Sequence, residues 1–166
     1  MQVTADSDVA GLLDRLVAKA LPNGRGLEAW ASLLQAHATL MRRLETDLAK
    51  ETGLALADFD VLAQLANAGG ELRMTDLAAR ALISRSGMTR RVTRLVEEGL
   101  VRRATATMDA RSVVVALTDA GVARLTETVP VHLRGVSELF VAKLDAEELA
   151  VLKSALDKVA VDGTFG

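Results

Sequence analysis

Residues 84–111 constrain this chain more than any other stretch, because a helix, a tight stop and a basic hairpin follow each other there without a gap. Ser84 is a good helix N-cap, since its hydroxyl can accept a hydrogen bond from an otherwise unpaired amide of the first turn. Gly99 supplies the left-handed residue that ends many helices. The order of helix, stop and hairpin predicts a winged helix-turn-helix whose second helix runs from Ser84 to Glu98.

The predicted helix has one narrow apolar face and an opposite face of small polar groups and arginine. The apolar face consists of Met88, Val92, Leu95 and Val96, and the opposite face of Ser86, Arg90, Thr93 and Glu97. The recognition helix of such a motif places its N-terminal residues against base edges in the major groove. We therefore expect Ser86, Thr89 and Arg90 to contact bases. Arg85 and Arg94 are expected to contact phosphates.

The residues on both sides of this helix complete the motif. Residues 100–103 and 113–117 have the pattern of two short strands around a polar tip. Residues 75–81 predict the first helix of the helix-turn-helix, and an apolar helix precedes it. The core side chains of that preceding helix are expected to be Phe59, Leu62 and Leu65. The expected fold class is mainly α-helical with a small β-hairpin wing.

The basic charge of one stretch favours double-stranded DNA as the partner, although the chain as a whole is slightly acidic. Residues 71–111 hold nine arginines against five acidic residues, a balance of +4, in a chain whose net charge is −2. A groove binder needs such a basic face, because neutralising phosphates and releasing counterions supplies most of the sequence-independent affinity. A solvated arginine-rich helix without a ligand is the alternative, but here the charges coincide with the winged-helix order of elements.

From about residue 27 to residue 159, the chain resembles the MarR family of dimeric bacterial transcriptional regulators. The most specific stretches are DAR at residues 109–111 and LTDAG at residues 117–121, which are similar to the family's Asp-x-Arg at the wing tip and Leu-Thr-x-x-Gly after it. The resemblance implies that Arg111 enters the minor groove and that Asp109 orients it.

The chain departs from the family pattern at three positions. Ala110 stands where many relatives have a second arginine, so one phosphate contact is expected to be missing. The family usually has a threonine or serine helix cap near Ala55 and near Arg73, and neither is present here. The missing caps blur the expected helix boundaries without touching the function.

Apolar seams precede and follow the motif. In residues 27–52 the apolar positions alternate steps of three and four, and the helix expected after Thr118 repeats this pattern. A last helix is capped by Asp145 with Glu148 three residues later, and a short helix is expected over residues 6–19. One small winged helix cannot cover all these faces. A homodimer paired through the terminal helices would bury them and present two recognition helices to a palindromic operator.

This organisation divides one domain, residues 1–166, into three parts. We expect N-terminal dimerisation helices at residues 6–53, a DNA-binding lobe at residues 54–118 and C-terminal dimerisation helices at residues 119–160.

Both histidines lie on the seams, where a histidine is more often a hydrogen-bonded core residue than a ligand. The other interpretation makes Trp30 and His37 part of an effector pocket between the dimer helices and the DNA-binding lobe, since relatives in the resembled family bind small aromatic or phenolic anions there. Asp60, Arg91 and Arg103 fall where a urate-responsive branch of the family has an aspartate and two arginines used for effector binding or its transmission. The N-terminal tryptophan of that branch has no counterpart here. An ordinary structural Asp-Arg pair is the alternative.

Composition argues against other classes of protein. The chain has no cysteine, and its four aromatic residues are too few for a reader of single-stranded nucleic acid. There is no signal pattern and no apolar run of membrane length, so we expect a cytoplasmic protein without a membrane partner. A Gly-rich phosphate loop, a nucleophile elbow and metal-ligand spacing are all missing from the sequence. We expect no enzymatic activity, no cofactor and no metal site.

The sequence thus predicts a dimeric DNA-binding transcriptional regulator, a repressor released by a small aromatic or phenolic anion. Two alternatives remain open. The first is a winged helix that serves as a protein-interaction module without binding DNA, against which the arginines on helix and wing argue. The second is a constitutive DNA binder with no effector.

Overall fold

The computed structural model describes the backbone of residues 6–21, 24, 26–81, 83–106 and 109–161, and their side chains except those of residues 6–10, 105–106, 109–112 and 161. The helices are α1 (Asp6–Ala20), α2 (Leu27–Thr52), α3 (Leu56–Asn67), α4 (Met74–Arg80), α5 (Arg85–Glu97), α6 (Asp119–Leu139) and α7 (Ala146–Val161). The strands are β1 (Glu71–Arg73), β2 (Val101–Ala106) and β3 (Asp109–Leu117), and a 3₁₀ turn η2 (Val141–Lys143) lies between α6 and α7. The fold is mainly helical with a small β wing, as predicted.

By its internal packing the chain divides into two compact units, Met1–Met41 and Arg42–Gly166, so the division falls inside α2. The first unit holds α1 and the beginning of α2. The second unit holds the end of α2 and all the remaining elements, which include both the predicted DNA-binding lobe and the predicted C-terminal helices. No helix in the described part of the chain is long and apolar enough to cross a bilayer.

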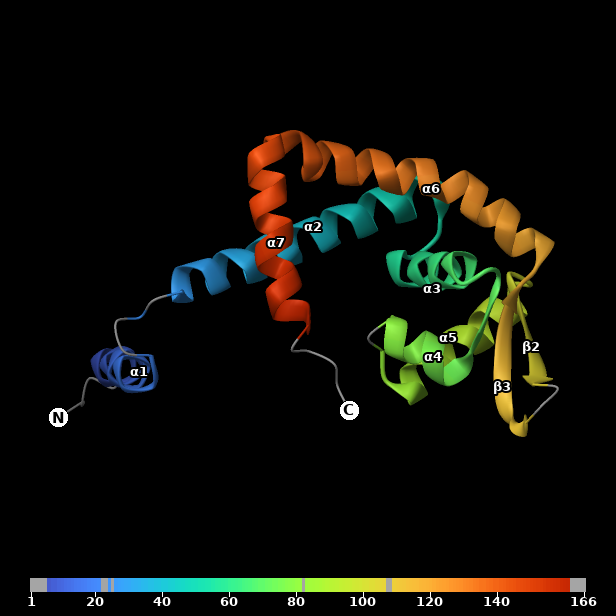
Figure 1. Cartoon of the computed structure of the whole chain (residues 1–166), viewed down its shortest axis with the longest axis horizontal. Coiled ribbons are helices and arrows are strands. Elements are labelled where there is room, and N and C mark those ends of the chain that lie inside the picture. The colour runs from blue at the N-terminus through green and yellow to red at the C-terminus, as the bar shows by residue number, and fades with distance from the viewer. Residues whose placement is uncertain (1–5, 22–23, 25, 82, 107–108, 162–166) are drawn as a thin grey trace. The chain divides into compact units, whose positions relative to one another are not determined.

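The second unit contains the winged helix-turn-helix. Figure 1 shows α3, α4 and α5 grouped beside the β2–β3 hairpin, with α6 leading away from the end of β3. Helix α4 contacts α5, and the first strand of the wing, β2, also contacts α5. Helix, turn and hairpin therefore adopt the predicted order around α5.

The sheet has three antiparallel strands in the order β1-β3-β2. The hairpin pairs Val101 with Leu117 at its base, and its register is irregular between Thr105 and Ala106. Strand β1 was not predicted, because three residues are too few for an alternation to be visible. In the structure Leu72 pairs with Val115 and turns inward between two exposed neighbours.

The core of this unit lies between α3, α4, α5 and the sheet. Its completely buried side chains include Val61, Leu62, Leu65, Leu77, Met88, Val92, Leu95 and Val115. Burying one such side chain contributes roughly 1.5 to 3 kcal/mol, so this cluster dominates the stability of the unit. Val96 was expected on the buried face of α5 but is 37% exposed. The helical phase that brings Met88, Val92 and Leu95 inward carries Val96 past the edge of the core.

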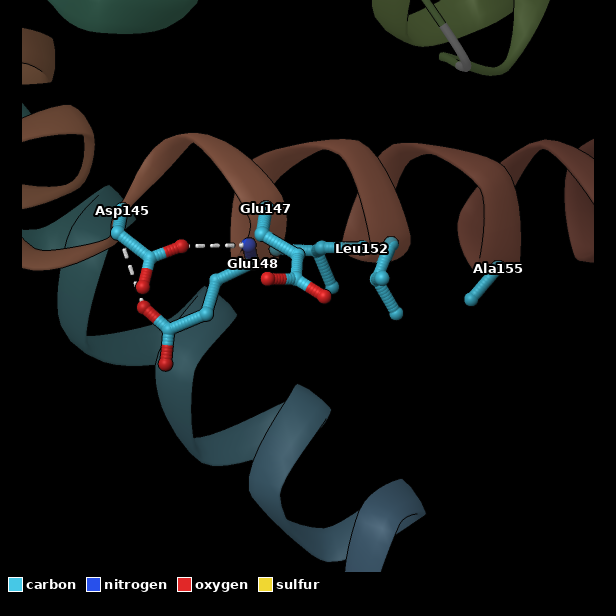
Figure 2. Close-up of a pocket in the computed structure, with 6 residues that line it drawn as sticks. Asp145, Glu147, Glu148, Leu152 and Ala155 are labelled. Carbon is cyan, nitrogen blue, oxygen red and sulfur yellow. Dashed lines mark hydrogen bonds between the residues drawn. The ribbon is translucent and has the colours of Figure 1, made fainter.

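Several helix ends follow the predictions. Gly53 and Gly99 have φ values of 71° and 73°, the left-handed conformation expected after α2 and α5. Asp145 Oδ1 accepts a hydrogen bond from the Glu148 amide at 2.8 Å, and Glu148 Oε2 accepts one from the Asp145 amide at 2.9 Å. Figure 2 shows this reciprocal capping box at the start of α7.

Helix α6 is joined closely to the end of α5 and to α2. Thr118 caps α6 by accepting from the Gly121 amide at 3.1 Å, and its hydroxyl also donates to the Gly99 carbonyl at 2.6 Å. Farther along α6, Arg124 donates to the Thr52 carbonyl at the end of α2. Arg134 forms two hydrogen bonds to the carboxylate of Glu51, at 2.5 and 2.6 Å.

Candidate DNA-binding site

The N-terminus of α5 is capped by Ser84 and packs closely against the residues that precede it. Ser84 has extended backbone, and its hydroxyl accepts a hydrogen bond from the Gly87 amide at 3.2 Å, which confirms it as the N-cap. A Cβ added at Gly87 would lie 2.9 Å from Ile83 Cγ2 and 3.1 Å from Ser84 Oγ. The first turn therefore has no room for a side chain at residue 87.

The residues predicted to contact DNA bases lie together on the exposed face of α5. Ser86, Thr89 and Arg90 are all exposed, and so is Arg85. The Thr89 hydroxyl donates to the Arg85 carbonyl at 2.9 Å. Its oxygen can therefore still accept a hydrogen bond from a partner. Within the described residues, Arg85 and Arg90 form neither a hydrogen bond nor an ion pair through their guanidinium groups.

Arg94 has a different environment from these two arginines. One of its terminal nitrogens donates to Asp58 Oδ2, and its Nε lies 3.9 Å from Glu98 Oε1. Its side chain is 51% exposed, so it borders the surface while bonded to acids. Acidic neighbours thus compensate part of the positive charge of Arg94, in contrast to the charges of Arg85 and Arg90.

Arg91 pairs with an aspartate, but not with Asp60. Its NH1 donates to Asp58 Oδ1 at 2.7 Å, and the Asp58 side chain is only 6% exposed. The resemblance placed Arg91 with Asp60 and Arg103 in an effector set, and a structural Asp-Arg pair was the alternative; in the structure the aspartate paired with Arg91 is Asp58. Asp58 shares the helical phase of Val61, Leu62 and Leu65, so an acidic residue on the core face of α3 was the available signal.

Arg103 also contacts the recognition helix. From β2, its guanidinium donates to the Thr93 hydroxyl at 2.5 Å and to the Thr89 carbonyl at 3.2 Å. These bonds join the base of the wing to α5. The structure therefore separates Arg103 from Arg91, because Arg103 bonds to α5 whereas Arg91, itself on α5, bonds to Asp58 of α3.

Asp60 lies near His132 of α6. The ring of His132 packs on Phe59, with centroids 4.6 Å apart. Burial lowers the pKa of His132 below its usual value, while the negative charge of Asp60 acts to raise it. The other two members of the predicted effector set, Trp30 and His37, lie on α2 in the first unit, where both are exposed.

The predicted minor-groove residues belong to the wing. The backbones of Asp109 and Arg111 are part of β3, and Asp109 pairs with Ala106 of β2. The side chains of both residues lie outside the described set. The predicted Asp109–Arg111 contact therefore stays a prediction.

Comparison with known proteins places this winged helix in a family. The family model described as MarR family matches residues 52–112, which span α3 to the wing. An HTH-type transcriptional regulator of Bacillus cereus, itself uncharacterised, is 31% identical over 117 residues. The match covers 70% of this chain and 77% of that relative.

Solved structures agree in sequence and in fold. AbsC, a MarR family transcriptional regulator from Streptomyces coelicolor, is 31% identical with a TM-score of 0.77, and the match covers 81% of this chain and 90% of AbsC. Sco3205, a MarR family regulator from the same organism solved in complex with DNA, is 30% identical with a TM-score of 0.79, covering 84% of this chain and 88% of Sco3205. The winged helix, the match to the family model and these relatives together show that the chain belongs to the MarR family of transcriptional regulators.

Proposed function

We propose that this regulator is a homodimeric repressor that binds double-stranded DNA at an inverted repeat and acts in the cytoplasm, where the operator is accessible. The observation that carries the proposal is the exposed start of α5, where Arg85, Ser86 and Arg90 are all accessible to a partner. The similarity of the chain to Sco3205, which was solved in complex with DNA, supports the same proposal.

In this proposal Arg90 is the principal reader of bases. An arginine donates two parallel hydrogen bonds to guanine in the major groove, the commonest specific contact between side chain and base. Ser86 and Thr89 contribute smaller contacts on the same face. Arg85 contacts a phosphate, and Arg94 makes a weaker phosphate contact because Asp58 and Glu98 already compensate part of its charge.

The wing supplies the second part of the interface. Arg111 enters the minor groove, where narrow regions have strong negative potential but little base code. Asp109 holds the guanidinium of Arg111 in a charge-assisted pair and so fixes its direction before DNA arrives. Arg111 therefore contributes affinity on many sequences alike.

Exposed apolar surface on the terminal helices supports the proposed dimer. Leu13 of α1, Trp30 and Leu34 of α2, and Val151 and Val159 of α7 are each about half exposed or more. A twofold pairing that covers such faces places two recognition helices on one side of the duplex. The half-site centres are then about one helical turn, roughly 10 bp, apart.

A small aromatic or phenolic anion relieves repression in this proposal, through a pocket that includes Trp30 and His37. Such a ligand must bind the two states of the dimer with different affinities, by about 1 to 3 kcal/mol for ordinary coupling. An organohalide-sensing regulator solved in its 2,4-dichlorophenol-bound form has the same fold, with a TM-score of 0.71. At 21% identity that likeness concerns the fold alone.

Selection of bound fragments from a random pool of duplex DNA tests the central claim. The wild-type chain should enrich an inverted repeat, and Arg90→Ala should lose preference at one position in each half-site, at a cost of about 1 to 3 kcal/mol. No enrichment would favour the protein-interaction alternative. An unchanged motif in the variant would remove Arg90 from its role as reader.

The effector is tested separately. A thermal-shift screen of aromatic acids should find a ligand that also weakens operator binding. If every ligand found leaves the affinity for DNA unchanged, a constitutive DNA binder becomes the better description.

A further inference from the structure

Asp58 is a buried carboxylate whose two oxygens both bond to the recognition helix. Oδ1 accepts from Arg91 at 2.7 Å, and Oδ2 accepts from Arg94. Because taking a carboxylate out of water costs several kcal/mol unless it is paired, Asp58 stabilises the fold only while these arginines stay in place. A single side chain of α3 therefore fixes two residues one turn apart on α5.

Asp58 lies near the start of its helix, but its two carboxylate oxygens bond to α5. Asp58 is the third residue of α3, a position from which a carboxylate commonly folds back to its own helix start. Here the first amide of α3, that of Leu56, donates instead to Glu45 Oε2 of α2 at 2.8 Å. The side chain of Asp58 itself reaches α5.

A second contact holds the opposite side of α5. Arg103 bonds to Thr93 and to the Thr89 carbonyl, as described above. By helical phase, Arg91 and Arg94 lie on one side of the exposed face, and Thr89 and Thr93 begin its other side. We call these the two flank contacts, that of Asp58 and that of Arg103.

The flank contacts enclose the predicted base readers, since Ser86 and Arg90 lie between them around the helix. A roll of α5 by about 20° about its axis would move the tip of a side chain about 8 Å from that axis by nearly 3 Å, which breaks a hydrogen bond. The close-packed apolar side chains of the buried face also oppose such a roll, and the flank contacts add a restraint on both distance and angle.

We propose that Asp58 is a positioning residue for sequence readout, which together with Arg103 fixes the rotation of the recognition helix and thereby decides which bases its exposed side chains reach. This inference rests on the proposed function, namely DNA binding through α5. It assigns Asp58 no contact with DNA.

The test measures specificity instead of affinity alone. Asp58→Asn keeps the size of the side chain but removes its charge, and Arg103→Gln removes the opposite flank contact. For each variant, the affinity for the selected repeat is divided by the affinity for random duplex DNA. This ratio should fall about tenfold, the effect of losing discrimination at one base pair. The selected motif should broaden at the positions that depend on Arg90.

Each variant has a matched control. Arg102→Gln removes the same charge from the neighbouring residue of β2, where Arg102 is exposed. Asp119→Asn removes an exposed carboxylate at the start of α6. Both controls should change the two affinities by equal factors, so their specificity ratio should stay within about twofold of the wild type.

The possible outcomes are distinct. If Asp58→Asn and Arg103→Gln weaken selected and random DNA equally, the positioning role is overturned and both residues are merely structural. If the wild-type chain itself shows no preference for the selected repeat, the proposed function fails independently of Asp58.

Thermal unfolding monitored by circular dichroism shows whether each variant is folded at the assay temperature. Should Asp58→Asn be unfolded, the comparison of Arg103→Gln with Arg102→Gln decides the question.

Discussion

The protonation state of His132 affects the stability of the second unit. Its ring packs on Phe59, and its Nδ1 is buried with no hydrogen-bond partner among the described residues. Protonation would place a second N–H group in this environment without an acceptor. The folded chain therefore favours neutral His132, in agreement with the direction in which burial moves its pKa.

A dependence of stability on pH follows from this lowered pKa. Between the folded pKa and the unfolded value of about 6.5, the unfolded chain binds more protons, so the free energy of unfolding should fall as the pH decreases. The contribution of His132 is complete above about pH 6.5 and is lost as the pH falls through the folded pKa. Urea unfolding at about pH 7.5 and pH 5.5 should show a smaller loss for His132→Gln than for the wild type. An identical loss in both chains would assign the effect to other groups.

Two glycines of α6 offer a matched pair of substitutions. A Cβ at Gly121 would lie 2.1 Å from the Leu100 carbonyl oxygen, a backbone atom, whereas a Cβ at Gly135 would lie 2.8 Å from the flexible end of Leu44. Gly121→Ala should therefore destabilise the chain by about 1 to 3 kcal/mol or more, because backbone has to move. Gly135→Ala should cost clearly less, since Leu44 can turn aside and alanine favours a helix. Urea unfolding measures both, and equal losses would contradict the assigned difference in packing.

The roles of some residues could be predicted from their own type and position. Ser84, Thr118 and Gly99 occupy helix ends, where local chemistry decides the outcome. The partner of Arg91 could not be predicted in this way, because the choice between Asp58 and Asp60 depends on how α3 turns against α5. Only an acidic residue in phase with Val61 and Leu65 indicated that Asp58 would be buried. The paired state of Arg94 depends on the same packing.

At the scale of elements, α3 lacks a capping side chain at its own N-cap residue and is capped by a side chain of another helix. Its N-cap residue, Ala55, has the extended backbone of a cap but no side-chain acceptor. Glu45 of α2 accepts from the Leu56 amide instead. The cap of α3 therefore also joins α3 to α2, a contact that a serine at residue 55 would not provide.

A new cap at residue 55 should therefore restore stability that is lost when the Glu45 cap is removed. Glu45→Ala should destabilise the chain by about 1 kcal/mol, as loss of an N-cap does. Ala55→Ser in the Glu45→Ala background should recover much of the loss, because a serine there has the backbone conformation to accept a first-turn amide. Urea unfolding of the single and double variants tests this. The alternative result, no recovery, would mean that Glu45 acts by joining α2 to α3 and not as a cap.

The long elements were predictable from periodicity. The limits of α2 at Leu27 and Thr52 agree with the seam of three- and four-residue steps and with the glycine that follows. Strand β1 was missed because its pairing partner, β3, lies some forty residues later in the chain. Short strands are specified by such distant pairing and hardly by their own sequence.

At the scale of the whole molecule, large apolar side chains remain exposed on the helices at both ends of the chain. On α7, Val151, Leu152 and Ala155 line one side of a shallow hollow, and Figure 2 shows Leu152 and Ala155 on the same side of the helix. Val151 and Val159 are 64% and 68% exposed. Contiguous apolar surface of this kind commonly marks a protein interface. The sequence predicted this surplus of apolar surface, but one chain cannot specify the geometry of pairing.

The proposed dimer gives the last prediction, since pairing of two chains would determine how strongly the molecule binds an inverted repeat. A double variant, Val151→Glu with Val159→Glu, changes two side chains that the isolated chain leaves exposed, so each chain should still fold. It should sediment as a monomer at micromolar concentration, where the wild type sediments as a dimer. Its affinity for the inverted repeat should fall about 100-fold or more, because two linked half-sites bind by effective concentration. Val113→Glu changes an exposed valine of β3, 42% exposed, which lies outside the proposed dimerisation helices, and should stay dimeric. A wild-type monomer that binds one half-site tightly would refute the proposed dimer, and a dimeric double variant would place the interface away from α7.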